Sequence, residues 1–246
     1  MSDSDFRPDP SYPAGPIVPS MRRRVFLRGV TAGTLVLALG GTTYVCASEA
    51  EEERARQAKR ADGRSRLPPN QYLLKRLRPM GGQEGDASPG HWKARVYGEV
   101  DAPFEIDFTE LLAMPQVEQL CDVHCVTKWT MLDAHWTGVR IADLAKRAKP
   151  KANVRHVVFE AAGGYTANVL LHEALAPTSL LAHRHEGLPL ATPHGAPVRA
   201  LVPDLYFWKS AKWLTGIKFV STDEPGFWEV RGYNNHADPW REERYS

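Results

Sequence analysis

A strand that ends in a cysteine is the feature that most constrains this chain. Residues 116–126 predict an extended strand, and Cys125 stands at its end, followed by Thr127, Lys128 and Trp129. A thiolate at the end of a strand is a ligand that soft metal ions prefer. The alternative is a free core cysteine, because free cysteine is among the most frequently buried residues. The fold must therefore contain a sheet that delivers this thiol to a pocket or to a core.

A disulfide, a zinc site and an active dithiol are each disfavoured for these cysteines. Cys121 and Cys125 lie four residues apart, roughly 13 Å along one strand, which is beyond the reach of a disulfide. With His124 they resemble half of a zinc site, but structural zinc needs four ligands and no second pair is evident. An active dithiol favours Cys-x-x-Cys at the start of a helix, which disfavours a thiol–disulfide oxidoreductase. We expect Cys121 to be a core residue.

Two later segments carry cationic side chains. Residues 194–199 read His-Gly-Ala-Pro-Val-Arg, and residues 208–213 read Trp-Lys-Ser-Ala-Lys-Trp. Arg199 offers a fork of donors, and Lys212 with the N–H groups of its loop can satisfy an anion. Each basic residue alone is more often an ordinary surface charge. Their joint spacing predicts a site for a phosphorylated, anionic ligand.

The remaining pattern predicts a mixed α+β domain with short connecting helices. Nineteen Pro and nineteen Gly among 246 residues favour many turns and short strands over a helical bundle. We expect a short helix over residues 110–114, capped by Asp107 or Thr109, and a second helix over residues 138–148. Further strands are expected over residues 92–100, 154–159, 165–171, 198–203 and 213–220.

The N-terminal part predicts an export leader. Arg23 and Arg24 precede an uncharged stretch over residues 29–46, as in twin-arginine export signals. A membrane anchor is the alternative, because these 18 residues are at the short end of a bilayer span of about 17–25 residues. The expected organisation is a disordered N-terminus over residues 1–20, a twin-arginine signal or membrane anchor over residues 21–47, a polar linker helix over residues 48–66 and the folded domain over residues 67–246.

Taken in order, the three motif segments resemble the molybdenum-cofactor domain of the sulfite oxidase family. The similarity is strongest to small bacterial sulfite oxidase-like oxidoreductases with a Cys-Val-Thr-x-Trp segment, and it runs from about residue 68 onward. It implies a β-rich α+β molybdopterin-binding domain in which Cys125 is the molybdenum ligand. It also implies that His124 and Lys128 act beside the metal. The other residues that it implies bind the pterin cofactor are Thr166, His194, Arg199, Ser210, Ala211 and Lys212.

The resemblance implies two-electron oxygen-atom transfer, either by a sulfite oxidase-like or by a sulfoxide reductase-like enzyme. Twin-arginine export moves folded proteins, which agrees with a cofactor inserted before export to the periplasm or cell exterior. The chain has no Cys-x-x-Cys-His, Gly-x-Gly-x-x-Gly or ferredoxin-like cysteine run, so we expect no haem, NAD or iron–sulfur cluster. Electrons would then be exchanged with a separate partner, such as a haem protein or cytochrome.

The alternative function is a non-catalytic exported module that binds an anion or a pterin with the same fold. Cys125 argues against it, because binding a phosphate needs no thiol. Nucleic acid is not expected as a partner, since the net charge is only +2 and no segment demands a concentrated basic face.

Further positions follow from the resemblance alone. Asn234 stands where relatives carry a histidine, so a catalytic role there is doubtful. Tyr206 and Trp208 are candidates for the walls of a substrate entrance. A sulfite pocket would need several positive charges, and the candidates for these are Lys128, Lys209 and Arg184.

Overall fold

The computed structural model describes residues 36–39, 42–45 and 47–246. The predicted disordered N-terminus and most of the predicted leader, with its two arginines, lie outside the described residues. Within the leader, β1 (Val36–Leu39) and β2 (Thr42–Val45) pair antiparallel. Of the helices that the structure describes, none is both long enough and apolar enough to cross a lipid bilayer.

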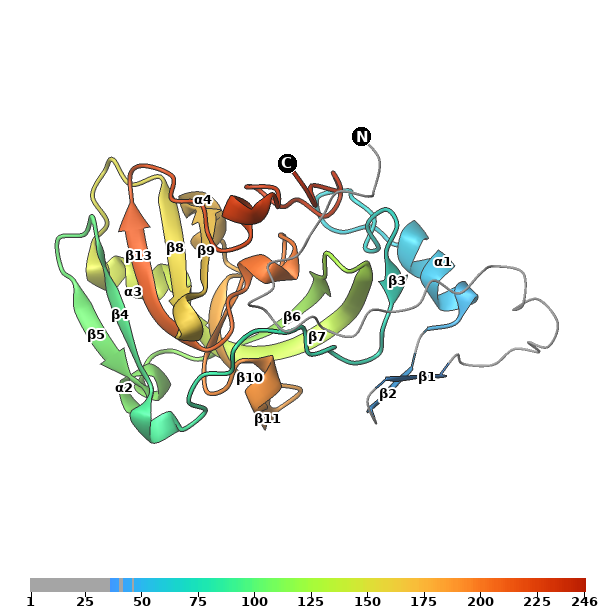
Figure 1. The fold of residues 1–246 in the computed structure, drawn as a ribbon, viewed down its shortest axis with the longest axis horizontal. Helices are drawn as coiled ribbons and strands as arrows, with labels where there is room; N and C mark the ends of the chain where they lie inside the picture. The colour runs from blue at the N-terminus through green and yellow to red at the C-terminus, as the bar shows by residue number, and fades with distance from the viewer. Residues whose placement is uncertain (1–35, 40–41, 46) are drawn as a thin grey trace. The chain divides into compact units, whose positions relative to one another are not determined.

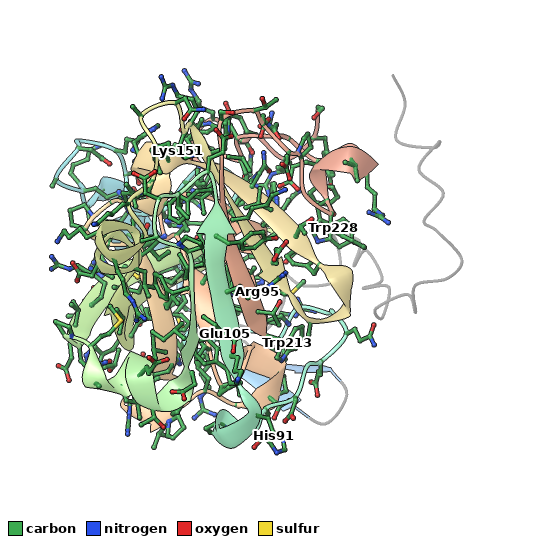
Figure 2. All side chains as sticks on the ribbon, turned by 90° about the vertical axis from the view of Figure 1, so that its left-hand side faces the viewer. His91, Arg95, Glu105, Lys151, Trp213 and Trp228 are labelled. Atoms are coloured by element: carbon green, nitrogen blue, oxygen red, sulfur yellow. The ribbon has the colours of Figure 1, made fainter. Side chains whose placement is uncertain are left out.

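One sheet has five strands in the order β5 (Phe104–Asp107), β4 (Lys93–Gly98), β13 (Leu214–Val220), β8 (His156–Ala161) and β9 (Thr166–Leu170) (Figure 1). β13 runs parallel to β4, and the other neighbours are antiparallel. Arg95 of β4 stands opposite Glu105 of β5, and both side chains are exposed (Figure 2). The other face of this sheet supplies the larger core.

The second sheet is built around the long strand β7 (Trp129–Arg140). Its neighbours are β6 (Val117–His124), β10 (Leu180–His185) and β3 (Tyr72–Leu73). β10 also pairs with β11 (Leu188–Pro189) and β12 (Arg199–Leu201). Because β6 and β7 form one hairpin, Cys125 leaves the sheet in the turn between them.

Short helices connect the strands. The Asp107 side chain caps α2 (Phe108–Ala113) by accepting the Glu110 N–H, and the Glu110 carboxylate accepts the Asp107 N–H, which completes a capping box. The other helices of the domain are α3 (Ile141–Ala148), α4 (Leu171–Ala174) and the 3₁₀ turns η1 (Pro89–His91), η2 (Ala162–Gly164), η3 (Thr192–His194), η4 (Phe207–Lys209) and η5 (Glu229–Arg231). The predicted α+β class with short connecting helices is confirmed.

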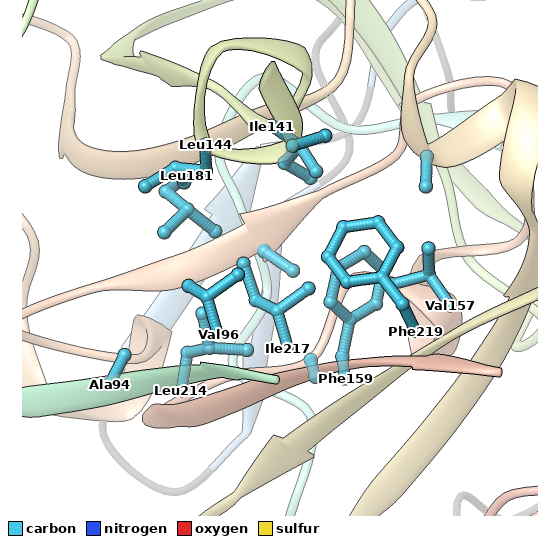
Figure 3. Packing of buried hydrophobic residues seen from close by; sticks show 14 of the residues in the cluster. Ala94, Val96, Ile141, Leu144, Val157, Phe159, Leu181, Leu214, Ile217 and Phe219 are labelled. Atoms are coloured by element: carbon cyan, nitrogen blue, oxygen red, sulfur yellow. The ribbon is translucent and has the colours of Figure 1, made fainter. Parts of the chain in front are cut away.

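Helix α3 packs against the five-stranded sheet. Its apolar residues Ile141 and Leu144 lie over Ile217, Phe159 and Phe219 of the sheet, and all five are fully buried (Figure 3). A second apolar cluster surrounds the tryptophans of β7 and includes Cys125. The thiol is therefore delivered into packed surroundings.

The segment before the domain is more than a spacer. Helix α1 (Glu49–Gln57) is shorter than the predicted linker helix, and Ala58 ends it. Ala55 is buried with Leu67 and Leu73. The Arg66 guanidinium binds Asp122 at 2.5 Å, and Asp122 is buried. This segment is consequently tied to the second sheet.

Strand β7 is where the sequence-based expectation was wrong. Residues 138–140 were expected to open a helix, but they are the end of β7 and pair with β10. The helix begins only at Ile141. Apolar residues on a strand and on a short helix give similar local patterns, and the partner strand β10 decided between them.

Candidate functional site

Cys125 lies in the tight turn that joins β6 to β7. The Cys125 N–H donates to the Trp129 carbonyl at 2.8 Å, and the Lys128 N–H donates to the Cys125 carbonyl at 3.0 Å. Lys128 adopts a positive φ of 73°. The Gln71 side-chain amide donates to the same Cys125 carbonyl at 3.1 Å. Hydrogen bonds from several sides therefore fix the direction of the thiol.

The thiol itself is buried and lies near positive charge. Cys125 is 4% exposed, and its Sγ lies 3.2 Å from Thr127 Oγ1. Burial raises the pKa of the thiol, whereas the Thr127 hydrogen bond and the charges of Arg78 and Arg244 act in the opposite direction. The two arginines thus favour the thiolate, which is the form that binds a metal.

The C-terminal segment brings Arg244 to this turn. Arg244 Nη1 donates to the Val126 carbonyl, and the guanidinium lies 4.9 Å from the centre of the Tyr206 ring. Arg244 is nine-tenths buried, and its Nη2 makes no hydrogen bond within the described residues. The same atom lies 3.8 Å from Glu242, which is exposed enough for solvent to weaken the attraction.

His124 and Lys128 flank Cys125 but are placed differently. His124 is fully buried, with Nδ1 2.9 Å from Thr130 Oγ1 and its ring packed edge-on against Trp240. Burial and, to a smaller extent, nearby arginines lower the His124 pKa to about 3, so the ring is neutral at neutral pH. Lys128 is exposed. Their catalytic roles remain predictions.

Arg199 is a buried cation that binds only carbonyl groups. It donates to the carbonyls of Ala200 at 3.3 Å, His194 at 3.0 Å and Ser210 at 2.7 Å. Only 2% of the residue is exposed, and burial lowers its pKa to about 9. Its guanidinium also lies 4.2 Å from the centre of the Phe207 ring. No described carboxylate contacts this charge, so an anionic ligand would stabilise it.

Lys212 has the same kind of surroundings. Its Nζ donates to the carbonyls of Met80 at 2.8 Å, Gly81 at 2.6 Å and Pro193 at 3.1 Å. Burial and the charge of Arg199 lower the Lys212 pKa to about 7, against an opposing effect of Glu84. Trp213 packs under this ammonium, just before the start of β13 (Figure 2). Arg199 and Lys212 together form a positive site whose described partners are neutral carbonyls.

The glycine of the 194–199 motif lets these cations approach each other. Gly195 has φ of 101°, and a Cβ there would lie 2.9 Å from Lys212 Cβ and 3.1 Å from Arg199 Cβ. His194 precedes it, and burial together with the charge of Arg199 lowers the His194 pKa to about 4. The neutral imidazole can therefore hydrogen-bond a ligand without adding charge.

Ser210 and Ala211 shape the site from within. Ser210 Oγ accepts the Val202 N–H at 2.9 Å, the Ser210 N–H donates to Phe207, and the Ala211 N–H donates to Lys209. In the described structure these two amides donate within their own turn, and their role in binding the ligand stays a prediction. From this segment, the Ser210 carbonyl accepts a hydrogen bond from Arg199, and Lys212 is one of the two cations of the site.

Met80 connects the two ends of the candidate site. Its Sδ lies 3.9 Å from Thr127 Oγ1, beside the thiol, while its carbonyl oxygen accepts from Lys212. Met80 therefore contacts both the turn that carries Cys125 and the ammonium group of Lys212. Cys125, Arg199 and Lys212, predicted from separate motifs, belong to one region of the fold.

Thr166 and Lys209 lie farther along the five-stranded sheet. Thr166 opens β9, and its carbonyl accepts the Phe227 N–H at 2.9 Å. Lys209 is fully buried and binds Glu229 at 2.6 Å together with oxygens of Asn168 and Asn235. Lys209 therefore does not present its charge to a substrate, contrary to expectation.

Several other candidates also have structural roles. Arg184 donates to the Gly187 carbonyl in the β10–β11 hairpin at 3.0 Å. The Asn234 side chain accepts the N–H groups of His236 and Ala237, which explains why an asparagine serves there. Tyr206 and Trp208 stack with ring centres 5.3 Å apart.

Two cavities lie away from these residues. One of about 460 Å³ is lined by α1, Leu73 and Leu132, and one of about 200 Å³ is lined by Cys121 and Asp204 among others.

Burial raises the Cys121 pKa, and Cys121 and Cys125 are both free thiols. Protonated thiols are poor nucleophiles, which further disfavours a dithiol enzyme. In the described part of the chain, no three His, Cys, Asp or Glu side chains form a group suited to a metal ion.

Sequence reasoning missed Arg78, Arg244 and Tyr233, which surround the thiol. Burial, with smaller effects of the nearby Tyr245 and Cys125, raises the Tyr233 pKa to about 12. All three residues lie far from Cys125 in sequence. The return of the C-terminal segment to the β6–β7 turn brings Tyr233 and Arg244 near the thiol, and Arg78 comes from the segment before β4.

Comparison with known proteins adds the following similarities. The family model described as the oxidoreductase molybdopterin binding domain matches residues 81–228. An uncharacterized oxidoreductase of Bacillus subtilis, YuiH, is 42% identical over 194 residues, which cover 77% of this chain and 97% of that protein. The catalytic subunits of protein-methionine-sulfoxide reductase, MsrP, from Ralstonia nicotianae and Burkholderia mallei are 30% and 32% identical over 169 residues. Those residues cover 62% of this chain and 51% of each subunit.

Among solved structures, the sulfane dehydrogenase SoxCD from Paracoccus pantotrophus has a similar fold. The TM-score is 0.54 at 17% identity, over 64% of this chain and 46% of that chain. This chain therefore spans about half the length of the sulfoxide reductase subunits and less than half of the SoxCD chain. At this identity, the similarity to SoxCD concerns the fold alone.

Proposed function

Because the chain belongs to the family of oxidoreductases with a molybdopterin-binding domain, we propose that it transfers an oxygen atom to or from a small sulfur oxyanion. Family membership implies a molybdenum–pterin cofactor. The proposal adds Cys125 as the metal ligand and an anionic substrate beside it. It also includes export by the twin-arginine route and electron exchange with a separate haem protein or cytochrome.

The observation that carries the proposal is the pairing of a buried thiol with two cations, the buried Arg199 and the partly buried Lys212, which make no salt bridge with a carboxylate among the described residues. Cys125 is a soft donor, and Arg199 and Lys212 bind only carbonyl oxygens within the described residues. A cofactor that joins a soft metal to a phosphate needs both features. The residues present therefore suit such a group.

When bound, the molybdenum–pterin group supplies the two-electron redox chemistry. The protein supplies position and charge. Arg199 and Lys212 would hold the anionic end, and Gly195 keeps the chain close enough for both to contribute. The hydrogen-bonded turn around Cys125 holds the thiol in one direction. Trp129 and Phe207, packed with ring centres 6.1 Å apart, exclude water between the two ends.

The charges beside Cys125 favour an anionic substrate. Arg78 and Arg244 both act on the thiol, and the Arg244 Nη2 is buried without a hydrogen bond among the described residues. An oxyanion such as sulfite would accept from such a donor, with a charge-assisted hydrogen bond. A neutral sulfoxide gains less from these charges. It remains the second candidate, because the MsrP relatives are named for protein-methionine-sulfoxide reduction.

The export part of the proposal is supported by the leader sequence. Arg23 and Arg24 precede an uncharged stretch over residues 29–46, which would serve as a membrane attachment if it is retained. Twin-arginine export accepts proteins that have already folded, as a domain with a buried cofactor must be. A lysine substitution of both arginines should leave the protein in the cytoplasm, and fractionation of cells would reveal this.

The first experiment measures molybdenum and pterin in protein purified from a host that makes the cofactor. We expect near one molybdenum and one pterin per chain. Cys125→Ser should retain the pterin and lose metal-centred activity. Folded wild-type protein without molybdenum or pterin would contradict the proposal and favour the non-catalytic binding module.

The substrate class is tested with Arg244→Met, and with Arg241→Met as the matched control in the same segment. Arg241 is 71% exposed. We expect Arg244→Met to raise the KM for sulfite at least about tenfold, because a hydrogen bond to a charged group contributes about 1.5–3 kcal/mol. Turnover of sulfoxides but not of sulfite, unchanged in Arg244→Met, would favour the second candidate.

A further inference from the structure

The ammonium group of Lys209 joins segments that are far apart in the sequence. Its Nζ lies 2.8 Å from both the carbonyl and the side-chain oxygen of Asn168. It lies 2.7 Å from the Asn235 carbonyl and 2.6 Å from Glu229 Oε1. Lys209 is fully buried. One cation therefore ties β9, η5 and the C-terminal segment to η4.

Each of these segments carries a residue of the candidate site within a few positions of its contact with Lys209. Thr166 precedes Asn168 by two residues on β9, and Tyr233 precedes Asn235 by two residues. Ser210, whose carbonyl accepts from Arg199, directly follows Lys209. The segment that contains Ser210, strand β9 and the segment that contains Tyr233 thus all lie beside the Lys209 ammonium group.

The charge and the donors of Lys209 are already used. An ammonium has three N–H donors, and four oxygens surround this one at 2.6–2.8 Å. Glu229 neutralises the charge, and Glu229 Oε1 also accepts from Trp208 Nε1 at 2.9 Å. Lys209 consequently has no donor left for a phosphate or a substrate. Its contribution must come through the segments that it holds.

Asn168 and Asn235 extend the same network. Asn168 Nδ2 donates to Asp223 at 2.7 Å and to Asn235 Oδ1 at 2.8 Å, and Asn235 Nδ2 donates to Asp223 at 2.6 Å. These amides orient the oxygens that face Lys209. Lys209, Asn168 and Glu229 form the buried part of this network, whereas Asn235 is exposed. The buried part favours one arrangement of its segments, because a displacement there leaves polar groups unpaired.

We propose that Lys209 is a positioning residue for the cofactor site: it fixes the Ser210–Lys212 turn relative to β9 and to the segment that carries Tyr233. The proposal rests on the proposed function, since it concerns where the molybdenum–pterin group is held. It differs from the expected role of Lys209 as a cation facing the substrate. Lys209 acts through other residues and does not touch the ligand.

The test uses the full chain from a cofactor-synthesising host, as wild type, Lys209→Met and Lys218→Met. Lys218 is the matched control, because it pairs with Glu224 on the surface of β13 at 2.7 Å. Pterin fluorescence after oxidation and molybdenum content are measured per folded chain, with circular dichroism to establish folding. Thermal unfolding is recorded beside them.

We expect folded Lys209→Met to retain at least about tenfold less pterin than wild type after gel filtration, the scale on which supporting residues affect bound metals. Lys218→Met should retain the wild-type amount. A purely structural role would lower the unfolding temperature and leave the pterin content of the folded fraction unchanged. That result would overturn the inference.

Asn168→Ala provides a milder variant if Lys209→Met fails to fold. It removes one of the four oxygens around the ammonium and keeps the Asn168 carbonyl. Partial loss of pterin from folded Asn168→Ala supports the inference, and full retention overturns it. A wild-type protein without pterin would instead refute the proposed function, so the two failures are distinguishable.

Discussion

At the scale of single residues, the candidate site depends on uncompensated charge. Arg199 is 2% exposed and donates to three carbonyl groups. Lys212 likewise donates to three carbonyl groups. Burying a cation such as Arg199 without a carboxylate among the described residues is costly, and the partly buried Lys212 beside it adds to a positive site that is suited to an anion. Gly195 makes this possible, because only a residue without Cβ allows the two side chains to approach at that point.

The role of Gly195 leads to the first prediction. Gly195→Ala should lower the free energy of unfolding by about 1–3 kcal/mol, since its φ of 101° is strained for alanine and the new Cβ contacts Lys212 and Arg199. Urea denaturation measures the change. Gly187→Ala is the control, because Gly187 has φ of 73° but no heavy atom within 4 Å of the position that a Cβ would occupy. Equal losses in the two variants would contradict the importance of the close approach.

At the scale of secondary-structure elements, the C-terminal segment is held to α4 by His236. Its Nε2 lies 2.8 Å from Glu173 and its Nδ1 lies 2.8 Å from Glu243. Burial alone would lower the His236 pKa, but Glu243 and Glu173 outweigh burial and raise it above its ordinary value of 6.5. Below its raised pKa, the His236 imidazole is charged and lies between two carboxylates. It positions the segment that carries Tyr233 and Arg244.

A pH dependence of stability follows from this link. A raised histidine pKa contributes stability that is fully present below pH 6.5 and is lost as the pH rises through the raised pKa. The free energy of unfolding of wild type should therefore exceed that of His236→Gln most at mildly acidic pH, and the difference should shrink above neutral pH. Denaturation at several pH values measures it. A difference that grows with pH would refute the assignment.

Helix α3 gives a second prediction at this scale. Leu144→Ala should lower the free energy of unfolding by about 2–5 kcal/mol, because Leu144 is fully buried against the five-stranded sheet. Leu112→Ala is the control, because Leu112 of α2 is 45% exposed. Denaturation midpoints compare the two variants. A similar effect of both would contradict the packing of α3.

At the scale of the whole molecule, the segment before the domain is part of its stability. Arg66 pairs with the buried Asp122, Trp240 Nε1 donates to the Ser65 carbonyl at 2.7 Å, and Ala55 is buried. Residues 48–66 were expected to be a linker. They instead connect the leader side of the chain to both the β6–β7 hairpin and the C-terminal segment.

A truncation tests this connection. A chain that begins at Pro68 should be less stable than one that begins at Ser48 by about 3 kcal/mol or more, because Asp122 would stay buried after losing Arg66. Urea unfolding of the two chains measures the difference. Indistinguishable midpoints would restore the interpretation of residues 48–66 as a spacer.

The sequence predicted the parts of the molecule that local patterns encode. The α+β class, the capped helix α2 and the strands around Cys125 are local, as are the motifs that contain Arg199 and Lys212. Strand β7 was missed at its end because β10 determines its length. Arg244 and Tyr233 were missed because their position near the thiol depends on the return of a distant segment, and Lys209 was misjudged because its partners come from three segments.

The span of the site along the chain has a consequence for when it can form. Gln71 supports the Cys125 turn from one side, and Arg244 donates to Val126 from the other. A nascent polypeptide that has left the ribosome only as far as β13 lacks Glu229, Tyr233 and Arg244. The arrangement described around Cys125 is therefore complete only after translation has passed residue 244, and a cofactor that depends on it must be inserted after that moment.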